Sequence, residues 1–322
     1  MSKTPAPQKA KLDLTKLRNK LKGRFLADFP EIQRLSTGIP RLDLMTGGGI
    51  PCGMITEIYG WYSSAKTLIG LHMIAELQKV GGLALFIDTE CSLNQDFASA
   101  IGVDTSQLIV LNPDNMEEVY GAMKEFILQT KDLNIPKLIF WDSLAATAAN
   151  NEDAEKVQVA PEARILSRIM QKIPKMLKEH NVAWVIINQL RNKIGVIYGP
   201  SEDTKGGNAV RYHGALRIEM TKGAQILEGK KVIGQEGKLK ITKSKICKPN
   251  QKMSFQILWD VGIVSDSGIY DALEDAKLIE KRGGWNYYTD DEGIEHKFRR
   301  KECDEWVKDY PELLARLGGG AS

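Results

Sequence analysis

The amino-acid sequence predicts an α/β fold: a mainly parallel sheet extended by antiparallel strands, with an N-terminal helix and a small C-terminal α+β domain. Three observations predict it. Apolar strands alternate with helical stretches through the middle of the chain, and the segments after about Arg211 are β-rich. Aromatic residues are concentrated near the C-terminus, which indicates a compact appendage. The 322 residues suffice for one large domain with small appendages.

The central block is expected to supply the parallel strands. Four continuous apolar runs of strand length are typical of strands that are covered on both faces: Met54–Tyr59, Leu83–Asp88, Lys137–Asp142 and Ala183–Asn188. The stretches between them have helical periodicity and are expected to form the covering helices: Thr67–Val80, Glu117–Thr130 and Ala163–His180.

Later segments are expected to extend this sheet with antiparallel strands, namely Gly214–Met220, Lys238–Lys245 and Met253–Trp259. Near the N-terminus, Leu12–Phe25 has apolar residues at helical spacing with Lys and Arg between them, which predicts a basic amphipathic helix. We therefore expect three parts: an N-terminal basic segment with an oligomerisation helix (1–34), the core (35–264) and a small C-terminal domain (265–322).

Positive charge is concentrated in two segments of a chain whose net charge is only +3. Residues 1–35 contain nine Lys and Arg against three Asp and Glu, and residues 222–252 contain nine against two. Such clusters favour an anionic partner, although charge alone is equally compatible with an ordinary solvated surface.

Several protein classes are not indicated. The four cysteines are scattered without metal-ligand spacing, which argues against a zinc site or a disulfide framework and favours a reducing cytosol. No apolar run reaches about 18 residues, and the N-terminal sequence lacks the apolar core of a signal peptide. We expect a soluble, cytoplasmic protein.

A phosphate-binding loop is the strongest motif. The sequence Gly60-Trp-Tyr-Ser-Ser-Ala-Lys-Thr67 lies between an expected strand and an expected helix, as a phosphate loop requires. It departs from the usual pattern at Ala65, where a second glycine is normal. If that position needs a positive φ, alanine costs about 1–2 kcal/mol. The residues expected to bind the nucleotide phosphates are Gly60, Ser63, Ser64, Ala65, Lys66 and Thr67.

Two carboxylates follow neighbouring expected strands. Asp142 ends one strand, where it can join Thr67 in holding Mg²⁺, and the alternative is a plain strand-end Asp that caps the next helix. Glu90 follows another strand, where it can polarise an attacking water, and the alternative is a surface Glu. The phosphate loop nearby favours the functional role in both cases.

Together these residues resemble the bacterial RecA recombinases and their phage relatives, from about Leu35 to Tyr288. The most specific stretch is Asn188-Gln-Leu-Arg-Asn-Lys-Ile-Gly195 followed by Gly206-Gly-Asn208. It separates this family from other phosphate-loop ATPases. The resemblance implies a RecA-like phosphate-loop ATPase core that uses ATP and Mg²⁺.

The resemblance also assigns roles around the nucleotide. Glu90 is similar to the family's water-activating carboxylate, and Gln189 to the glutamine that senses the γ-phosphate. Phe97 lies where the family places an aromatic ring over the adenine. Lys243 and Lys245 resemble paired lysines that reach the nucleotide of a neighbouring subunit.

Two segments resemble the family's DNA-binding loops. One is Asn150–Ala160, followed by a helix with Arg164 and Arg168, and the other is Gln189–Asn208. Cationic side chains and the backbone N–H groups of a glycine-containing loop can bind DNA phosphates, and an apolar side chain can insert between bases. The residues expected to bind DNA are Arg164, Arg168, Arg191, Lys193, Ile194, Gly206, Gly207 and Asn208. A long unstructured connection is the alternative, but such loops usually have a function.

The implied function is an ATP-dependent recombinase. It would form a head-to-tail helical filament on single-stranded DNA, pair with a homologous duplex and exchange strands. Ala65 motivates an alternative: a nucleotide-gated DNA-binding filament with little hydrolysis. A ring-shaped helicase is disfavoured by the Gln189–Asn208 segment. The sequence leaves a bacterial and a phage origin open.

Overall fold

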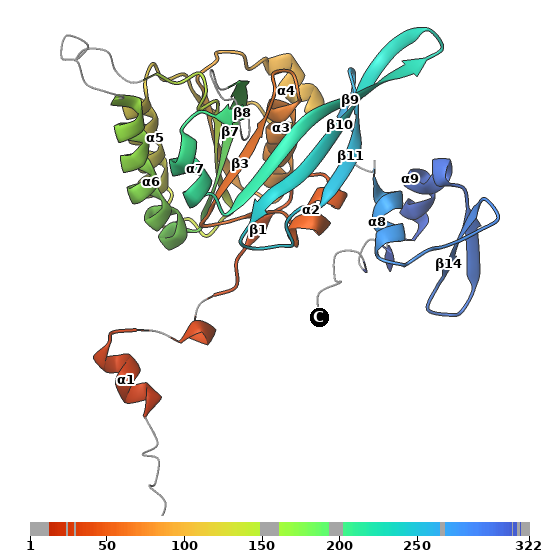
Figure 1. Cartoon of the computed structure of the whole chain (residues 1–322), viewed down its shortest axis with the longest axis horizontal. Helices are drawn as coiled ribbons and strands as arrows, with labels where there is room; N and C mark the ends of the chain where they lie inside the picture. The colour runs from red at the N-terminus through yellow and green to blue at the C-terminus, as the bar shows by residue number, and fades with distance from the viewer. Residues whose placement is uncertain are drawn as a thin grey trace, which may run out of the picture. The chain divides into compact units, whose positions relative to one another are not determined.

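The computed structural model describes residues 13–23, 25–28, 30–148, 161–192, 202–264, 268–310, 312, 313 and 316 (Figure 1). The chain divides into two units, Met1–Ile32 and Gln33–Ser322. Within the described residues, no helix combines the length and the apolar character needed to cross a membrane.

The described residues of the first unit contain one short α-helix, α1 (Leu14–Lys20), and a 3₁₀ turn, Leu26–Asp28. The Asp13 side chain caps α1 by accepting the Lys16 N–H. The expected helix Leu12–Phe25 is therefore too long at its C-terminal end, since α1 ends at Lys20 and Lys22 has a positive φ of 51°. None of the α1 residues is buried, so packing within this chain does not lengthen the helix.

The second unit is built on a large mixed sheet with the strand order β12-β11-β10-β9-β3-β7-β6-β4-β5. The part from β9 to β5 is parallel, and the part from β9 to β12 is antiparallel. The parallel strands are β3 (Ile55–Gly60), β4 (Leu83–Asp88), β5 (Ile109–Leu111), β6 (Lys137–Asp142), β7 (Val182–Asn192) and β9 (Leu216–Glu228). The added strands are β10 (Lys231–Ser244), β11 (Lys252–Leu258) and β12 (Gly262–Ile263). The predicted fold class is confirmed.

Helices cover both faces of the parallel part (Figure 1). On one face lie α2 (Pro40–Thr46), α3 (Lys66–Lys79) and α4 (Gln95–Ile101). On the other lie α5 (Met116–Gln129), α6 (Pro161–His180) and α7 (Gly207–His213). Side chains along each strand alternate between these two cores; in β7, Ile187 belongs to the first core and Ile186 to the second.

The segment expected as the second DNA loop is partly regular. β7 continues to Asn192, and β8 (Glu202–Thr204) pairs with it antiparallel, with Leu190 opposite Thr204. The chain then enters α7 at Gly207. The expectation of a continuous loop from Gln189 to Asn208 is therefore wrong at both of its ends. Leu190 is buried at this pairing, which stabilises it.

The remaining elements complete the chain. β1 (Arg34–Leu35) pairs with β2 (Ile50–Pro51). The C-terminal part contains α8 (Ile269–Asp275), α9 (Cys303–Trp306), the 3₁₀ turns Arg300–Glu302 and Val307–Asp309, and an antiparallel sheet of β13 (Glu280–Arg282), β14 (Trp285–Thr289) and β15 (Glu295–Phe298). Its core combines aliphatic and aromatic side chains, with Phe298 and Trp306 stacked at 3.9 Å between ring centroids. The expected mixture of helices and antiparallel strands is present, within the unit Gln33–Ser322.

Candidate nucleotide and DNA site

The phosphate loop leaves the centre of the sheet between β3 and α3. Gly60 ends β3, and a Cβ added there would lie 2.1 Å from the Met220 carbonyl oxygen of the adjacent β9. Any side chain would force the two strands apart. The first position of the loop therefore has to be glycine for a packing reason.

The backbone of Ala65 adopts the positive φ that the phosphate-loop pattern left open. It has φ 63° and ψ 29°, which is the left-handed region, and it forms the N-cap of α3. This is the conformation that glycine adopts without strain, so alanine carries a cost of about 1–2 kcal/mol here. The loop keeps the backbone shape that the usual glycine would give, at the expense of local strain.

Lys66 is buried and lies within the loop. Its Nζ donates to the Trp61 carbonyl at 2.9 Å, to the Ser64 hydroxyl at 3.2 Å and to the Gly60 carbonyl at 3.4 Å. Burial lowers the pKa of this ammonium, while the Asp142 and Glu90 carboxylates oppose that shift. The Lys66 ammonium is thus held at the N-terminus of α3. Both its positive charge and the helix dipole favour binding of an anion there.

Thr67 and Asp142 are brought together from different elements. The Thr67 hydroxyl at the start of α3 donates directly to the Asp142 carboxylate at the end of β6. Burial, with a smaller contribution from the nearby Glu90, raises the Asp142 pKa to about 6. A hydroxyl and a carboxylate are hard oxygen donors, so this pair fits a Mg²⁺ shell.

Glu90 and Gln189 also meet. The Gln189 Nε2 donates to Glu90 Oε1 at 2.9 Å, and the Ser143 hydroxyl donates to the same oxygen at 2.7 Å. Gly60 and Gln189 are paired partners in β3 and β7, which places the phosphate loop beside this contact. The predicted water-activating carboxylate and the predicted γ-phosphate sensor therefore form one hydrogen-bonded group.

Residues 63–67, Glu90, Asp142 and Gln189 line one cavity of about 560 Å³, whereas Gly60 does not line it. Phe97 from α4 lines it too, with an exposed ring. The sequence did not indicate several other lining residues, among them Gln235 on β10 and Trp259 just after β11. Their signal is weak, because only the antiparallel extension of the sheet brings them to the loop. The exposed indole of Trp259 offers a second aromatic surface for a base.

The predicted DNA-binding residues are partly described. Arg164 and Arg168 are exposed and four residues apart on α6, so they share one helix face. Arg191, near the end of β7, is exposed and donates to the Ala145 carbonyl at 3.2 Å. Gly206 has φ 82° and precedes α7, whose first turn contains Gly207 and Asn208. The segment Asn150–Ala160 and the residues Lys193 and Ile194 lie outside the described residues.

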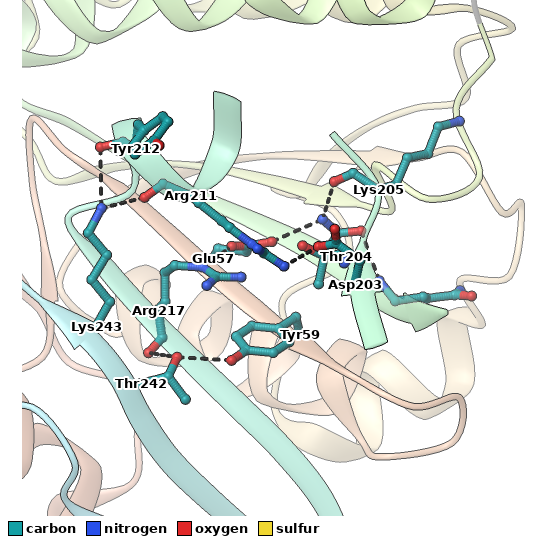
Figure 2. Close-up of polar contacts among 12 residues, drawn as sticks. Glu57, Tyr59, Asp203, Thr204, Lys205, Arg211, Tyr212, Arg217, Thr242 and Lys243 are labelled. Atoms are coloured by element: carbon teal, nitrogen blue, oxygen red, sulfur yellow. Dashed lines mark hydrogen bonds and ion pairs between the residues drawn. The ribbon is translucent and has the colours of Figure 1, made fainter. Parts of the chain in front are cut away.

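Lys243 and Lys245 lie at the C-terminal end of β10 and just beyond it. Lys243 Nζ donates to the carbonyls of Arg211 and Tyr212 at the end of α7 (Figure 2). Burial lowers the Lys243 pKa, and the nearby Lys245 contributes in the same direction. Lys245 is exposed, so the two lysines lie at the protein surface next to α7.

The fold and the strand-end side chains are those of a phosphate-loop nucleotide-binding protein. The family model of the RecA N-terminal domain matches residues 24–264, and the chain belongs to the RecA family of DNA recombination and repair proteins. The chain is 34% identical to the RecA protein of Geobacter metallireducens over 292 residues, which cover 89% of this chain and 84% of that protein. It is 35% identical to the RecA protein of Bacteroides thetaiotaomicron over 293 residues, which cover 90% and 87%.

Proposed function

We propose that this chain is a DNA-dependent ATPase that assembles as a helical filament on single-stranded DNA and catalyses homologous pairing and strand exchange. The contact between Gln189 and Glu90 carries the proposal. It links the side chain proposed to activate water with the strand that continues into the candidate DNA segment. A single substitution on β7 can therefore affect both the nucleotide site and the candidate DNA segment.

In this proposal each side chain has one task. Lys66 and the loop N–H groups bind the phosphates, Thr67 and Asp142 hold Mg²⁺, and Glu90 accepts the proton of the attacking water. When bound, Mg²⁺ would neutralise charge on the phosphates. Phe97 stacks on the base, and Lys243 and Lys245 act on the nucleotide of a neighbouring subunit. DNA is bound by residues of α6 and of the second candidate DNA segment: Arg164, Arg168, Arg191, Lys193, Ile194, Gly206, Gly207 and Asn208.

We also propose the division of labour along the chain: 1–34 docks on an adjacent protomer, 35–264 is the ATPase core, and 265–322 is a small separate domain. Head-to-tail docking does not close on itself and generates a filament. Electron microscopy of the protein with single-stranded DNA and a slowly hydrolysed ATP analogue tests this, with filaments expected and isolated particles as the contrary result.

The enzymatic test has two parts. Fluorescence anisotropy of labelled single-stranded DNA should show binding that requires ATP, and a strand-exchange assay should yield heteroduplex product. Absence of either, with an active positive control, would reject the proposal.

The alternative function is a nucleotide-gated DNA-binding filament with little hydrolysis. The left-handed alanine at position 65 is the observation that favours it. Steady-state phosphate release separates the two: stimulation by DNA supports the ATPase, and background release with intact DNA binding supports the scaffold.

A further inference from the structure

One buried amide joins the strand of the phosphate loop to the candidate DNA segments. Asn188 on β7 is fully buried and makes three side-chain hydrogen bonds. Its Nδ2 donates to Glu57 Oε1 at 2.9 Å and to the Lys205 carbonyl at 2.8 Å, and its Oδ1 accepts the Gln189 N–H at 2.9 Å. Because both donors face acceptors and the oxygen faces a donor, only one orientation of the amide fits.

The first partner lies on the strand that ends in the phosphate loop. Glu57 is three residues before Gly60 on β3 and is fully buried. Its charge is balanced by Arg217 of β9, whose Nε donates to Glu57 Oε2 at 2.5 Å (Figure 2). The Arg217 guanidinium also lies 4.5 Å from the centre of the Tyr59 ring. This end of the network is therefore tied to the loop strand by an ion pair and a cation–π contact.

The second partner lies within the second candidate DNA segment, Gln189–Asn208. The Lys205 main chain is held by Asn188, and Lys205 is followed directly by Gly206 and α7. Its side chain donates to the Thr147 carbonyl at 2.6 Å and pairs with Glu162 of α6 at 3.1 Å. Thr147 and Glu162 bracket the first candidate DNA segment, Asn150–Ala160. Lys205 thus belongs to the second segment, contacts residues on either side of the first, and is held by one amide.

The third partner is the residue proposed to sense the γ-phosphate. The Asn188 oxygen holds the N–H of Gln189, and the Gln189 side chain contacts Glu90. A shift of Gln189 that follows the nucleotide would change the geometry at Asn188, and through it the position of Lys205.

We propose that Asn188 is a positioning residue that couples the nucleotide site to the DNA segments by holding the Lys205 carbonyl, Glu57 and the Gln189 N–H together. The proposal deepens the proposed function and rests on it. Asn188 touches neither the phosphates nor the DNA in this scheme, and it acts only through its three partners.

Two variants separate coupling from simple stability. Asn188→Asp replaces the Nδ2 donor by an oxygen that faces the Glu57 carboxylate and the Lys205 carbonyl, so both bonds are lost. Adding Glu57→Gln to it restores one of them: the new amide donates to the new carboxylate and still accepts from Arg217, with the same net charge. The bond to the Lys205 carbonyl stays broken in the double variant. Asn286→Asp is the matched control, because Asn286 is also buried, at 3% exposed, and donates to a carbonyl in the C-terminal domain.

The first measurement is the DNA-stimulation ratio, defined as phosphate release with single-stranded DNA divided by release without it for the same variant. Melting temperature is measured in parallel. Asn188→Asp should lower both the melting temperature and the ratio, the latter at least tenfold or to unity. The double variant should regain most of the melting temperature but not the ratio, and Asn286→Asp should keep the wild-type ratio. A double variant that regains both, or an Asn188→Asp protein with a wild-type ratio, would overturn the proposal.

The second measurement does not involve DNA. Hydrogen exchange of the amides of β8 and α7 is compared with and without a slowly hydrolysed ATP analogue and Mg²⁺. The analogue should slow exchange severalfold in the wild-type and Asn286→Asp proteins, and should leave it unchanged in Asn188→Asp and in the double variant. Lack of response in the wild type, or a normal response in Asn188→Asp, rejects the coupling. A responsive wild type without DNA-stimulated hydrolysis would instead reject the proposed function and leave the coupling intact.

Discussion

Replacing Ala65 by glycine tests whether the phosphate loop carries backbone strain. Ala65 has φ 63°, and the left-handed region costs an L-residue about 1–2 kcal/mol that glycine does not incur. Two effects of the change oppose this gain. Glycine raises the entropy of the unfolded chain, which destabilises the folded state by about 0.4–1 kcal/mol. The burial of the Ala65 methyl group is also lost, and a fully buried methyl contributes up to about 0.8 kcal/mol. The absolute change in unfolding free energy is therefore small.

A matched substitution removes these common contributions. Ala122 is partly buried like Ala65 but lies inside the regular helix α5, where glycine costs about 1 kcal/mol. Ala122→Gly has the same entropy and methyl effects and no strain to release. We expect the Ala65→Gly protein to be more stable than the Ala122→Gly protein by about 1–2 kcal/mol.

Urea unfolding followed by circular dichroism measures this difference through the shift of the midpoint. Equal destabilisation by the two substitutions would refute the strain argument. Phosphate release by Ala65→Gly should stay within about threefold of wild type, because the loop already has the backbone conformation that glycine adopts, and threefold corresponds to only about 0.7 kcal/mol in the barrier. A large acceleration would mean that Ala65 limits hydrolysis, in favour of the scaffold alternative.

Three further predictions concern single side chains. Glu90→Gln should reduce phosphate release at least 100-fold while ATP-dependent DNA binding persists, and unchanged turnover would exclude Glu90 as the base. Phe97→Ala should weaken nucleotide binding in a fluorescence titration by about 1–3 kcal/mol, whereas Phe97→Tyr should bind like wild type; equal binding by all three proteins would exclude stacking. His72 accepts the Ile263 N–H, and burial lowers its pKa to about 4, so stability that is complete above pH 6.5 should fall by on the order of 3 kcal/mol as pH drops to 4. His72→Gln keeps an acceptor and should lack this loss, and parallel pH curves for the two proteins would contradict the assignment.

The parallel core was predictable because its signal is local. The expected bounds Leu83–Asp88 and Lys137–Asp142 agree with β4 and β6, since an apolar run that ends in a carboxylate marks both the burial and the exit of a strand. The same reasoning placed Asp142 and Glu90 near Thr67, because parallel strands present their carboxyl ends at one edge of the sheet.

Features that depend on distant partners were not predictable. Nothing in the polar sequence of Glu202–Thr204 indicates a strand, and it becomes one only because β7 offers an edge for pairing. Gln235 and Trp259 reach the cavity through antiparallel pairings whose register the sequence leaves open. Glu57 could have been noticed as a charge inside an apolar strand, but its pairing with Arg217 required the structure.

The alternation of side chains along β7 explains how one strand serves two sites. Ile187 packs in the core beneath α3 and Ile186 in the core beneath α6, so Gln189 faces the phosphate loop while Asn188 faces the opposite side of the sheet. Successive residues of a strand point to opposite faces of the sheet, so only one peptide unit separates the Gln189 side chain from the Asn188 side chain. A movement at the nucleotide face can therefore reach the opposite face directly through β7. Any displacement of Gln189 along the strand must move the Asn188 side chain, and a buried amide with all its hydrogen bonds made has no free rotamer in which to absorb the movement. The proposed coupling thus follows from strand geometry and from the contacts that anchor Lys205.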